Sequence, residues 1–368
     1  MKSVFRKFVL LLFAVVMFLA GSAFAADVPT VKVGYIFTTH HTPLMVAALK
    51  GEALKSQGVY LKPVVAKDKY ELIENGKTVA VLQFIVAKSG AETASLFARN
   101  HLDLAMASVT AMMAGIDKGT PIKILSPLQT EGMALVAPPD SSLRDWPSLT
   151  AFVKKSNKPV KIGYHSPTSA PKIVLEGALK QAGLKVTENP NDASAQVLLA
   201  DLKETTNLLP ALSSKQVDAV VGPSPFPEVA VSKKIGKIVA DLGDLPPSGA
   251  WRDFPCCVTV ANSGMISSHP EVVQAFVALM ARTNIWCNTH KEDSALLAAE
   301  WIGISREAAL ASSLVYLPKF SDQWMRNTGV YMGILNNMGK FSGQLKDKNI
   351  GKAKAILFDM RFIDNVKL

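Results

Sequence analysis

The feature of this sequence that most restricts its fold is a repeated order of short apolar run, polar loop and helix-forming segment. Residues 31–37 form a β-rich run, and after a polar loop Thr42 and Pro43 have the residue types of a helix N-cap and first helical position. Similar apolar runs occur at 102–107, 122–126, 160–164, 196–199 and 218–221. Strands that alternate with helices across short loops predict α/β layers around mostly parallel sheets.

Two segments depart from this order. From Pro270 to about Met338, apolar residues recur at helical spacing, which predicts a helical C-terminal segment. Residues 60–77 are charged and contain Asn75-Gly76, a pair typical of tight hairpin turns. We therefore expect an additional hairpin before a strand at 79–86.

Two breaks in the pattern indicate that the chain crosses twice between two lobes. The first follows Glu131-Gly132, and the second lies in the Pro/Gly-rich stretch 244–255. The predicted division is a signal peptide at 1–25, a first lobe of 26–132 plus 251–368, and an inserted second lobe of 133–250. A ligand cleft is expected between the lobes, because open α/β sheets bind ligands at the carboxyl ends of strands and pockets favour domain interfaces.

The first 25 residues have the features of a secretory signal peptide. Lys2, Arg6 and Lys7 accompany an apolar run at 8–20, and Ala23-Phe24-Ala25 is a small-x-small cleavage site. The run is shorter than the roughly 20 residues that span a bilayer as a helix. We therefore expect an exported, periplasmic chain that begins at Ala26.

The formal net charge of +10 is spread along the chain. Basic residues do not gather in a stripe, which argues against a nucleic-acid partner. The sequence lacks GxSxG, HExxH, GxGxxG and phosphate-loop patterns, so we expect no enzyme, no catalytic residue and no cofactor.

Three cysteines are too few for a disulfide framework. Cys256 and Cys257 are expected to be packed strand residues, since free cysteine behaves as a small hydrophobe; a bridge from Cys287 to one of them is the alternative. His40 and His41 have no carboxylate or cysteine at ligand spacing beside them, so no metal site is expected.

The candidate ligand contacts are polar residues in the loops between strands and helices. There the free N–H groups and the helix dipole favour an anionic or electron-rich group, although serine and threonine at these places also cap helices. The candidates are Thr38, Thr39, His40, His41, Ser108, Thr110, Ser166, Thr168 and Ser169. Ser224, Phe226 and Trp251 are further candidates near the cleft mouth and the second crossing, where such aromatics also serve as core residues.

The order of these pieces resembles the periplasmic solute-binding components of ABC transporters in the nitrate, sulfonate and taurine group, which includes pyrimidine-precursor binders. The resemblance rests on residues 31–37 with the following polar turn, 100–108, 163–170 and 212–219. It implies a two-lobed periplasmic binding protein fold (type II-like) and a monomer that closes around a small polar or anionic molecule and delivers it to an ABC transporter permease. Oxyanions, sulfonates, small carboxylates and planar heterocycles remain open as ligands. A sensor for a membrane signalling protein and a pyrimidine-precursor binder or enzyme are the alternative functions.

Overall fold

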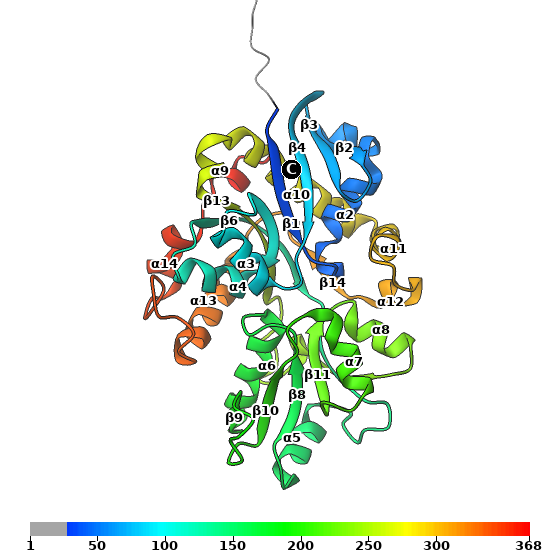
Figure 1. The fold of residues 1–368 in the computed structure, drawn as a ribbon, viewed down its shortest axis with the longest axis vertical. Coiled ribbons are helices and arrows are strands. Elements are labelled where there is room, and N and C mark those ends of the chain that lie inside the picture. The colour runs from blue at the N-terminus through cyan, green and yellow to red at the C-terminus, as the bar shows by residue number, and fades with distance from the viewer. Residues whose placement is uncertain (1–27) are drawn as a thin grey trace, which may run out of the picture.

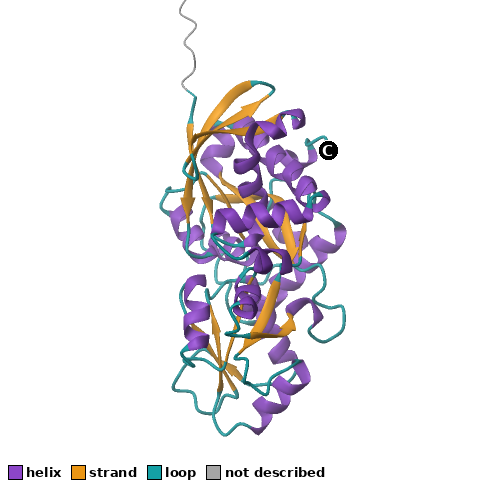
Figure 2. Cartoon of the chain, turned by 90° about the vertical axis from the view of Figure 1, so that its right-hand side faces the viewer, coloured by secondary structure: helices purple, strands orange, loops and turns teal. Residues whose placement is uncertain are grey.

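Two β-sheets organise the chain, each at the centre of one α/β lobe, and the lobes are stacked along the long axis in Figures 1 and 2. The computed structural model describes residues 28–368, so the expected signal peptide lies outside the described residues. No helix within 28–368 has both the length and the apolar character needed to cross a membrane.

The sheet of the first lobe has eight strands in the order β14-β6-β13-β5-β1-β4-β3-β2. Their bounds are β1 Thr30–Tyr35, β2 Val59–Val65, β3 Lys69–Glu74, β4 Lys77–Val86, β5 Leu104–Ser108, β6 Ile122–Glu131, β13 Pro255–Asn262 and β14 Leu314–Tyr316. Only the pairs of β1 with β4 and β5 are parallel. The expectation of a mostly parallel sheet is therefore wrong here, because strands that return across the lobe boundary or from a tight turn pair antiparallel.

The second lobe has a six-stranded sheet in the order β12-β7-β11-β8-β10-β9. The bounds are β7 Met133–Ala137, β8 Val160–Tyr164, β9 Val186–Thr187, β10 Val197–Asp201, β11 Ala219–Pro223 and β12 Lys237–Asp241. Strands β8 to β11 are parallel to one another, whereas β7 pairs antiparallel with β11 and β12. The carboxyl ends of the parallel strands open toward the first lobe, which places their loops at the junction (Figure 1).

Helices cover the faces of both sheets (Figure 2). The loops at the junction of the lobes carry the polar residues discussed below. In the first lobe the helices are α2 Thr42–Lys50, α3 Gly90–Ala98, α4 Val109–Asp117, α9 Ser263–Ser268, α10 Pro270–Thr289, α11 Lys291–Ile302, α12 Arg306–Ala311, α13 Asp322–Asn337, α14 Ile350–Leu357 and α15 Arg361–Asp364. In the second they are α5 Trp146–Lys155, α6 Ala170–Gln181, α7 Leu208–Ser213 and α8 Phe226–Ser232. The helical C-terminal segment is present, interrupted by β14.

The start of the first helix differs from the expectation. Thr42 is the first residue of α2 rather than its N-cap, and one 3-10 turn, η1 (Thr39–His41), precedes it. Thr38 caps that turn by accepting a hydrogen bond from the His40 N–H at 2.9 Å. The additional turn rotates His40 and His41 into the protein interior, where both are buried.

The expected hairpin at 60–77 is formed by β2 and β3, which pair antiparallel. Asn75 and Gly76 have φ of 49° and 79° and join β3 to β4 instead of closing the hairpin itself. Positive φ at both central residues is the geometry that favours Asn-Gly in tight turns. The three strands extend the sheet of the first lobe to its edge.

The chain crosses between the sheets at Gly132 and again between β12 and β13. Gly132 has φ of 70° and adjoins Glu131, which also has a positive φ of 67°. The two crossings are tied together, since the Asp253 N–H donates a hydrogen bond to Glu131 Oε1 at 2.7 Å. We call these two crossings the hinge. The hydrogen bond makes the hinge one bonded unit rather than two independent linkers.

Candidate functional site

A cavity of about 30 Å³ lies between the lobes, at the loops that follow the strands. The first lobe contributes Ile36, Thr38, His40, His41, Gly90, Ser108, Cys256 and Cys257, and the second lobe contributes His165, Ser169, Pro171, Thr205 and Pro223. Because both sheets supply its walls, any molecule held there contacts both lobes at once. The described lining contains no lysine, arginine or carboxylate.

The lobes are joined directly beside this cavity. Thr110 Oγ1 donates a hydrogen bond to the Thr168 carbonyl at 2.6 Å, and the Ala170 N–H donates to Ser108 Oγ at 3.2 Å. The two hydroxyls of the first lobe are themselves 2.8 Å apart. These bonds cross from β5 and α4 to the start of α6, so the structure is a closed arrangement of the two lobes.

His40 and two cysteines form a buried cluster in the cavity wall. His40 Nδ1 lies 3.2 Å from Cys256 Sγ and 3.9 Å from Cys257 Sγ, and the two sulfur atoms are 3.9 Å apart. On the other side of its ring, His40 Nε2 donates to the Gly132 carbonyl at 2.8 Å. The hinge backbone therefore fixes the imidazole with Nδ1 toward the sulfur atoms.

The cluster favours charge separation between thiol and imidazole. A hydrogen bond from Cys257 and, against the opposing effect of burial, the adjacent His40 lower the pKa of Cys256 well below its usual value. Burial opposes protonation of His40, but the charge and hydrogen bond of Cys256 and the bond to Gly132 together raise the pKa of His40. Interaction with Cys256 and burial raise the pKa of Cys257. Both shifts favour transfer of a proton from the Cys256 thiol to the His40 ring.

Two further histidines near the cavity are held neutral. Burial lowers the pKa of His41 to about 3, and its Nδ1 accepts a hydrogen bond from the Ile36 N–H at 3.0 Å. Burial and the nearby His40 lower the pKa of His165 to about 4. His165 Nδ1 and the neighbouring Ser166 Oγ are buried and have no hydrogen-bond partner within the described protein. Orphaned polar atoms of this kind call for a partner, because an unmet buried group destabilises the fold.

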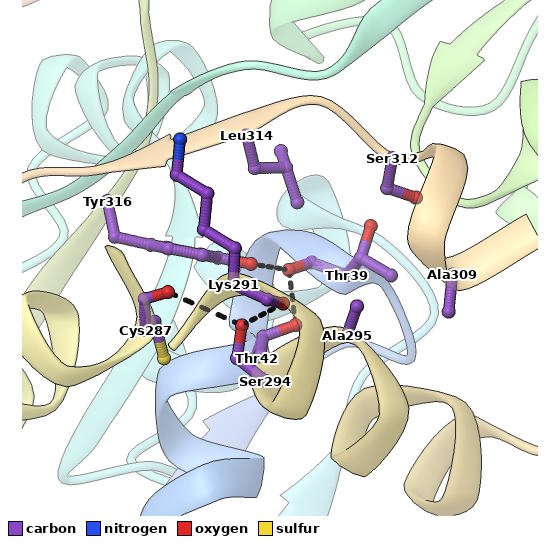
Figure 3. Close-up of a pocket in the computed structure, with 10 residues that line it drawn as sticks. All are labelled: Thr39, Thr42, Cys287, Lys291, Ser294, Ala295, Ala309, Ser312, Leu314 and Tyr316. Atoms are coloured by element: carbon purple, nitrogen blue, oxygen red, sulfur yellow. Dashed lines mark hydrogen bonds between the residues drawn. The ribbon is translucent and has the colours of Figure 1, made fainter. Parts of the chain in front are cut away.

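The structure brings only some of the predicted site residues to the cavity. Thr38, His40, His41, Ser108 and Ser169 line it, whereas Thr110 and Thr168 form the bond between the lobes. Thr39 instead points into a separate pocket of about 60 Å³ between α2, α11, α12 and β14 (Figure 3). In Figure 3, Thr39 lies beside Tyr316, whose hydroxyl donates to the Thr39 carbonyl at 2.8 Å.

The three outlying candidates are placed away from the cavity lining. Ser224 Oγ donates to Glu228 at 2.6 Å at the start of α8, and Phe226 packs against a small core cluster of the second lobe. Trp251 is buried against Phe254 under the hinge, and its indole N–H donates to the Pro246 carbonyl at 3.1 Å. None of the three lines the cavity.

The sequence did not predict that Cys256 and Cys257 lie at the cavity. Cys256 and Cys257 are buried strand residues of β13, as expected, but they also face His40, which lies 216 positions away from Cys256. His40 and the two cysteines are far apart in the sequence, and the pairing of β13 with β5 brings the cysteines beside His40. All three cysteines, which lie in the described part of the chain, are free, and Cys287 packs separately with Val46 and Tyr316 instead of bridging.

Solved structures show the same fold. The ligand-binding component of an ABC-type import system from Staphylococcus aureus, described with zinc bound, is 16% identical, with a TM-score of 0.69 over 92% of this chain and 99% of that one. The nitrate-binding protein NrtA from Synechocystis is 14% identical (TM-score 0.64, 93% and 99% covered). The alkanesulfonate-binding protein SsuA from Xanthomonas axonopodis, bound to MOPS, is 14% identical (TM-score 0.63, 86% and 96% covered). The fold is that of the periplasmic binding proteins.

Sequence comparison places the chain in a family. An uncharacterized protein of Methanocaldococcus jannaschii is 33% identical over 140 residues, which are 37% of this chain and 96% of that protein. The sequence model of the NMT1-like family matches residues 25–303, which include the cavity residues of both lobes and both cysteines of the cluster. The chain is therefore a member of the NMT1-like family.

Proposed function

We propose that this protein is the exported solute-binding receptor of an ABC importer. It binds one small ligand in the cavity between the lobes and presents the closed form to a membrane permease. The observation that carries the proposal is the convergence of loops from both sheets on one buried cavity. A ligand in that position stabilises closure through its contacts with the second lobe, which is the differential interaction that a hinged receptor needs.

The expected ligand class is nitrate, sulfonate or taurine, and the chemistry of the lining limits it further. Hydroxyl groups come from Thr38, Ser108, Ser169 and Thr205, and the described lining offers positive charge only through His40. The cavity is small, so in this closed arrangement it suits a compact ligand.

Native mass spectrometry of the protein taken from its own periplasm tests the proposal. A bound small molecule at one per chain is expected, and titrations with nitrate, taurine and MOPS then identify its class. Absence of a bound molecule, together with no binding of these anions or of metal ions, would contradict the receptor function.

A variant of the second lobe tests the location of the ligand. Ser166→Ala removes a buried hydroxyl that has no partner within the described chain, and we expect binding about five- to tenfold weaker from the loss of one hydrogen bond. Ser194→Ala is the matched control, because its exposed hydroxyl bonds only to Asp192. Equal affinity of the two variants would show that the Ser166 hydroxyl, which adjoins the cavity-lining His165, does not bond to the ligand.

A further inference from the structure

We infer that the cavity binds a thiophilic metal ion of the Zn²⁺ or Cu⁺ type through His40 Nδ1 and the sulfur atoms of Cys256 and Cys257. This assignment rests on the proposed receptor function, for which it names the cargo. All three donor atoms lie within 4.8 Å of one another, and all three residues are buried. The two cysteines belong to the hydrophobic core, and their sulfur atoms also face the His40 ring from another loop.

The donor spacing matches a metal site. A tetrahedral Zn²⁺ with bonds of about 2.3 Å to sulfur and 2.0–2.1 Å to nitrogen holds two sulfur ligands about 3.8 Å apart and a sulfur and a nitrogen ligand about 3.6 Å apart. The sulfur–sulfur distance here is 3.9 Å, and the two sulfur–nitrogen distances are 3.2 and 3.9 Å. An ion therefore needs displacements of only a few tenths of an ångström to reach all three donors.

The surroundings of His40 are those of a ligating histidine. Its Nε2 donates to the Gly132 carbonyl at 2.8 Å, which leaves Nδ1 as the coordinating atom. Metal-bound histidines commonly donate the other ring N–H in this way, since the bond fixes the ring orientation and raises its basicity. On binding, protons held by His40 Nδ1 and the cysteine sulfurs pass to solvent, because neutral imidazole and thiolates are the ligating forms.

One residue of the second lobe, His165, shares the cavity with the three donors. His165 lines the same cavity, is 6% exposed, and its Nδ1 has no hydrogen-bond partner within the described chain. It lies outside the group of three donors. Three protein ligands with an open position suit an exchangeable ion, whereas structural zinc sites are closed by four. His165 is placed to hydrogen-bond the exchangeable ligand at the open position, which would couple metal binding to lobe closure.

The donor set also selects the kind of ion. Thiolate and imidazole favour Zn²⁺ and Cu⁺, while Mg²⁺ and Ca²⁺ require oxygen ligands such as carboxylates. No carboxylate is among the described residues that line the cavity.

Zinc titration of reduced, chelator-treated protein tests the inference. In competition with a chromophoric chelator we expect one Zn²⁺ per chain, and at least a hundredfold weaker binding by Cys256→Ser, Cys257→Ser and His40→Gln. Cys287→Ser is the matched control, because it removes an equally buried thiol from another part of the first lobe and is expected to bind like wild type. Retention of zinc by a Cys256→Ser/Cys257→Ser double variant, or equal loss in Cys287→Ser, would overturn the assignment.

Wild-type protein supplies a second measurement that no folding defect can obscure. With Cd²⁺ in place of Zn²⁺, we expect the ultraviolet charge-transfer absorption of two cadmium–thiolate bonds at one Cd²⁺ per chain, and no response to Ca²⁺. His165→Ala is expected to weaken Zn²⁺ binding about tenfold and to abolish metal-induced compaction in small-angle X-ray scattering. Absence of both Zn²⁺ binding and Cd²⁺ absorption refutes the metal site.

Binding of metal ions and of anions to the wild-type protein distinguishes failure of the metal assignment from failure of the proposed function. If Zn²⁺ and Cd²⁺ do not bind but nitrate or taurine does, the metal assignment fails and the receptor function stands. If neither metal ions nor anions bind and the protein from the periplasm has no ligand, the receptor function itself fails.

Discussion

Gly132→Ala is the most informative single change, because Gly132 joins β6 to β7 and its carbonyl holds His40. Its φ of 70° lies in the left-handed region, where a residue with a Cβ costs about 1–2 kcal/mol. A Cβ at this position would also lie 2.3 Å from Leu314 Cδ2 and 3.0 Å from His40 Nε2. Overpacking of this kind costs about 1–3 kcal/mol, so the expected loss of unfolding free energy is about 2–5 kcal/mol.

Urea unfolding of matched variants separates the two contributions. Gly119→Ala carries the backbone cost alone, because its φ is 90° and a Cβ would meet no atom within 4 Å. Adding Leu314→Ala to Gly132→Ala removes the clash, and the double-mutant cycle should show a coupling of about 1–3 kcal/mol. If Gly132→Ala costs no more than Gly119→Ala, or if the coupling is absent, the proposed packing of the hinge is refuted.

Three further predictions concern stability, acid sensitivity and lobe closure. Lys172→Met should lower the unfolding free energy in urea by about 1–3 kcal/mol, because Glu176 and Glu188 lose a fully buried cation and Glu176 keeps only its ion pair with the exposed Lys180. No loss would contradict a stabilising network. His41→Asn should make stability less sensitive to acid, because the folded pKa of about 3 lies below the unfolded 6.5. The wild type should lose about 2.5 kcal/mol more unfolding free energy than the variant between pH 7 and 4.5, and parallel pH profiles would argue against a neutral His41. Thr110→Val removes the hydroxyl that bonds to the second lobe, so the closed form should become about tenfold less populated. X-ray scattering measures this opening. An unchanged scattering curve would show that the bond does not hold the lobes together.

Local pattern was sufficient for the α/β character, the two crossings and most of the loops at the cavity. Strand and helix periodicity is a property of neighbouring residues, so the runs at 31–37, 102–107 and 160–164 correspond to β1, β5 and β8. Polar residues at the ends of these strands include Thr38, Ser108 and Ser169, which line the cavity. The direction in which a loop side chain points does not follow from strand or helix periodicity. Thr39, which was expected at the same site, faces another pocket.

Only the tertiary structure decided which loops meet and which atoms face one another. Strand order placed β13 antiparallel to β5 and so brought Cys256 and Cys257 to the loop that follows β1. The 3-10 turn before α2 then rotated His40 toward the two sulfur atoms, and Gly132 at the hinge fixed the ring from behind. Such contacts cannot be predicted from the spacing of residues along the chain. The pairing of distant strands depends on the burial of whole sheets rather than on any local motif.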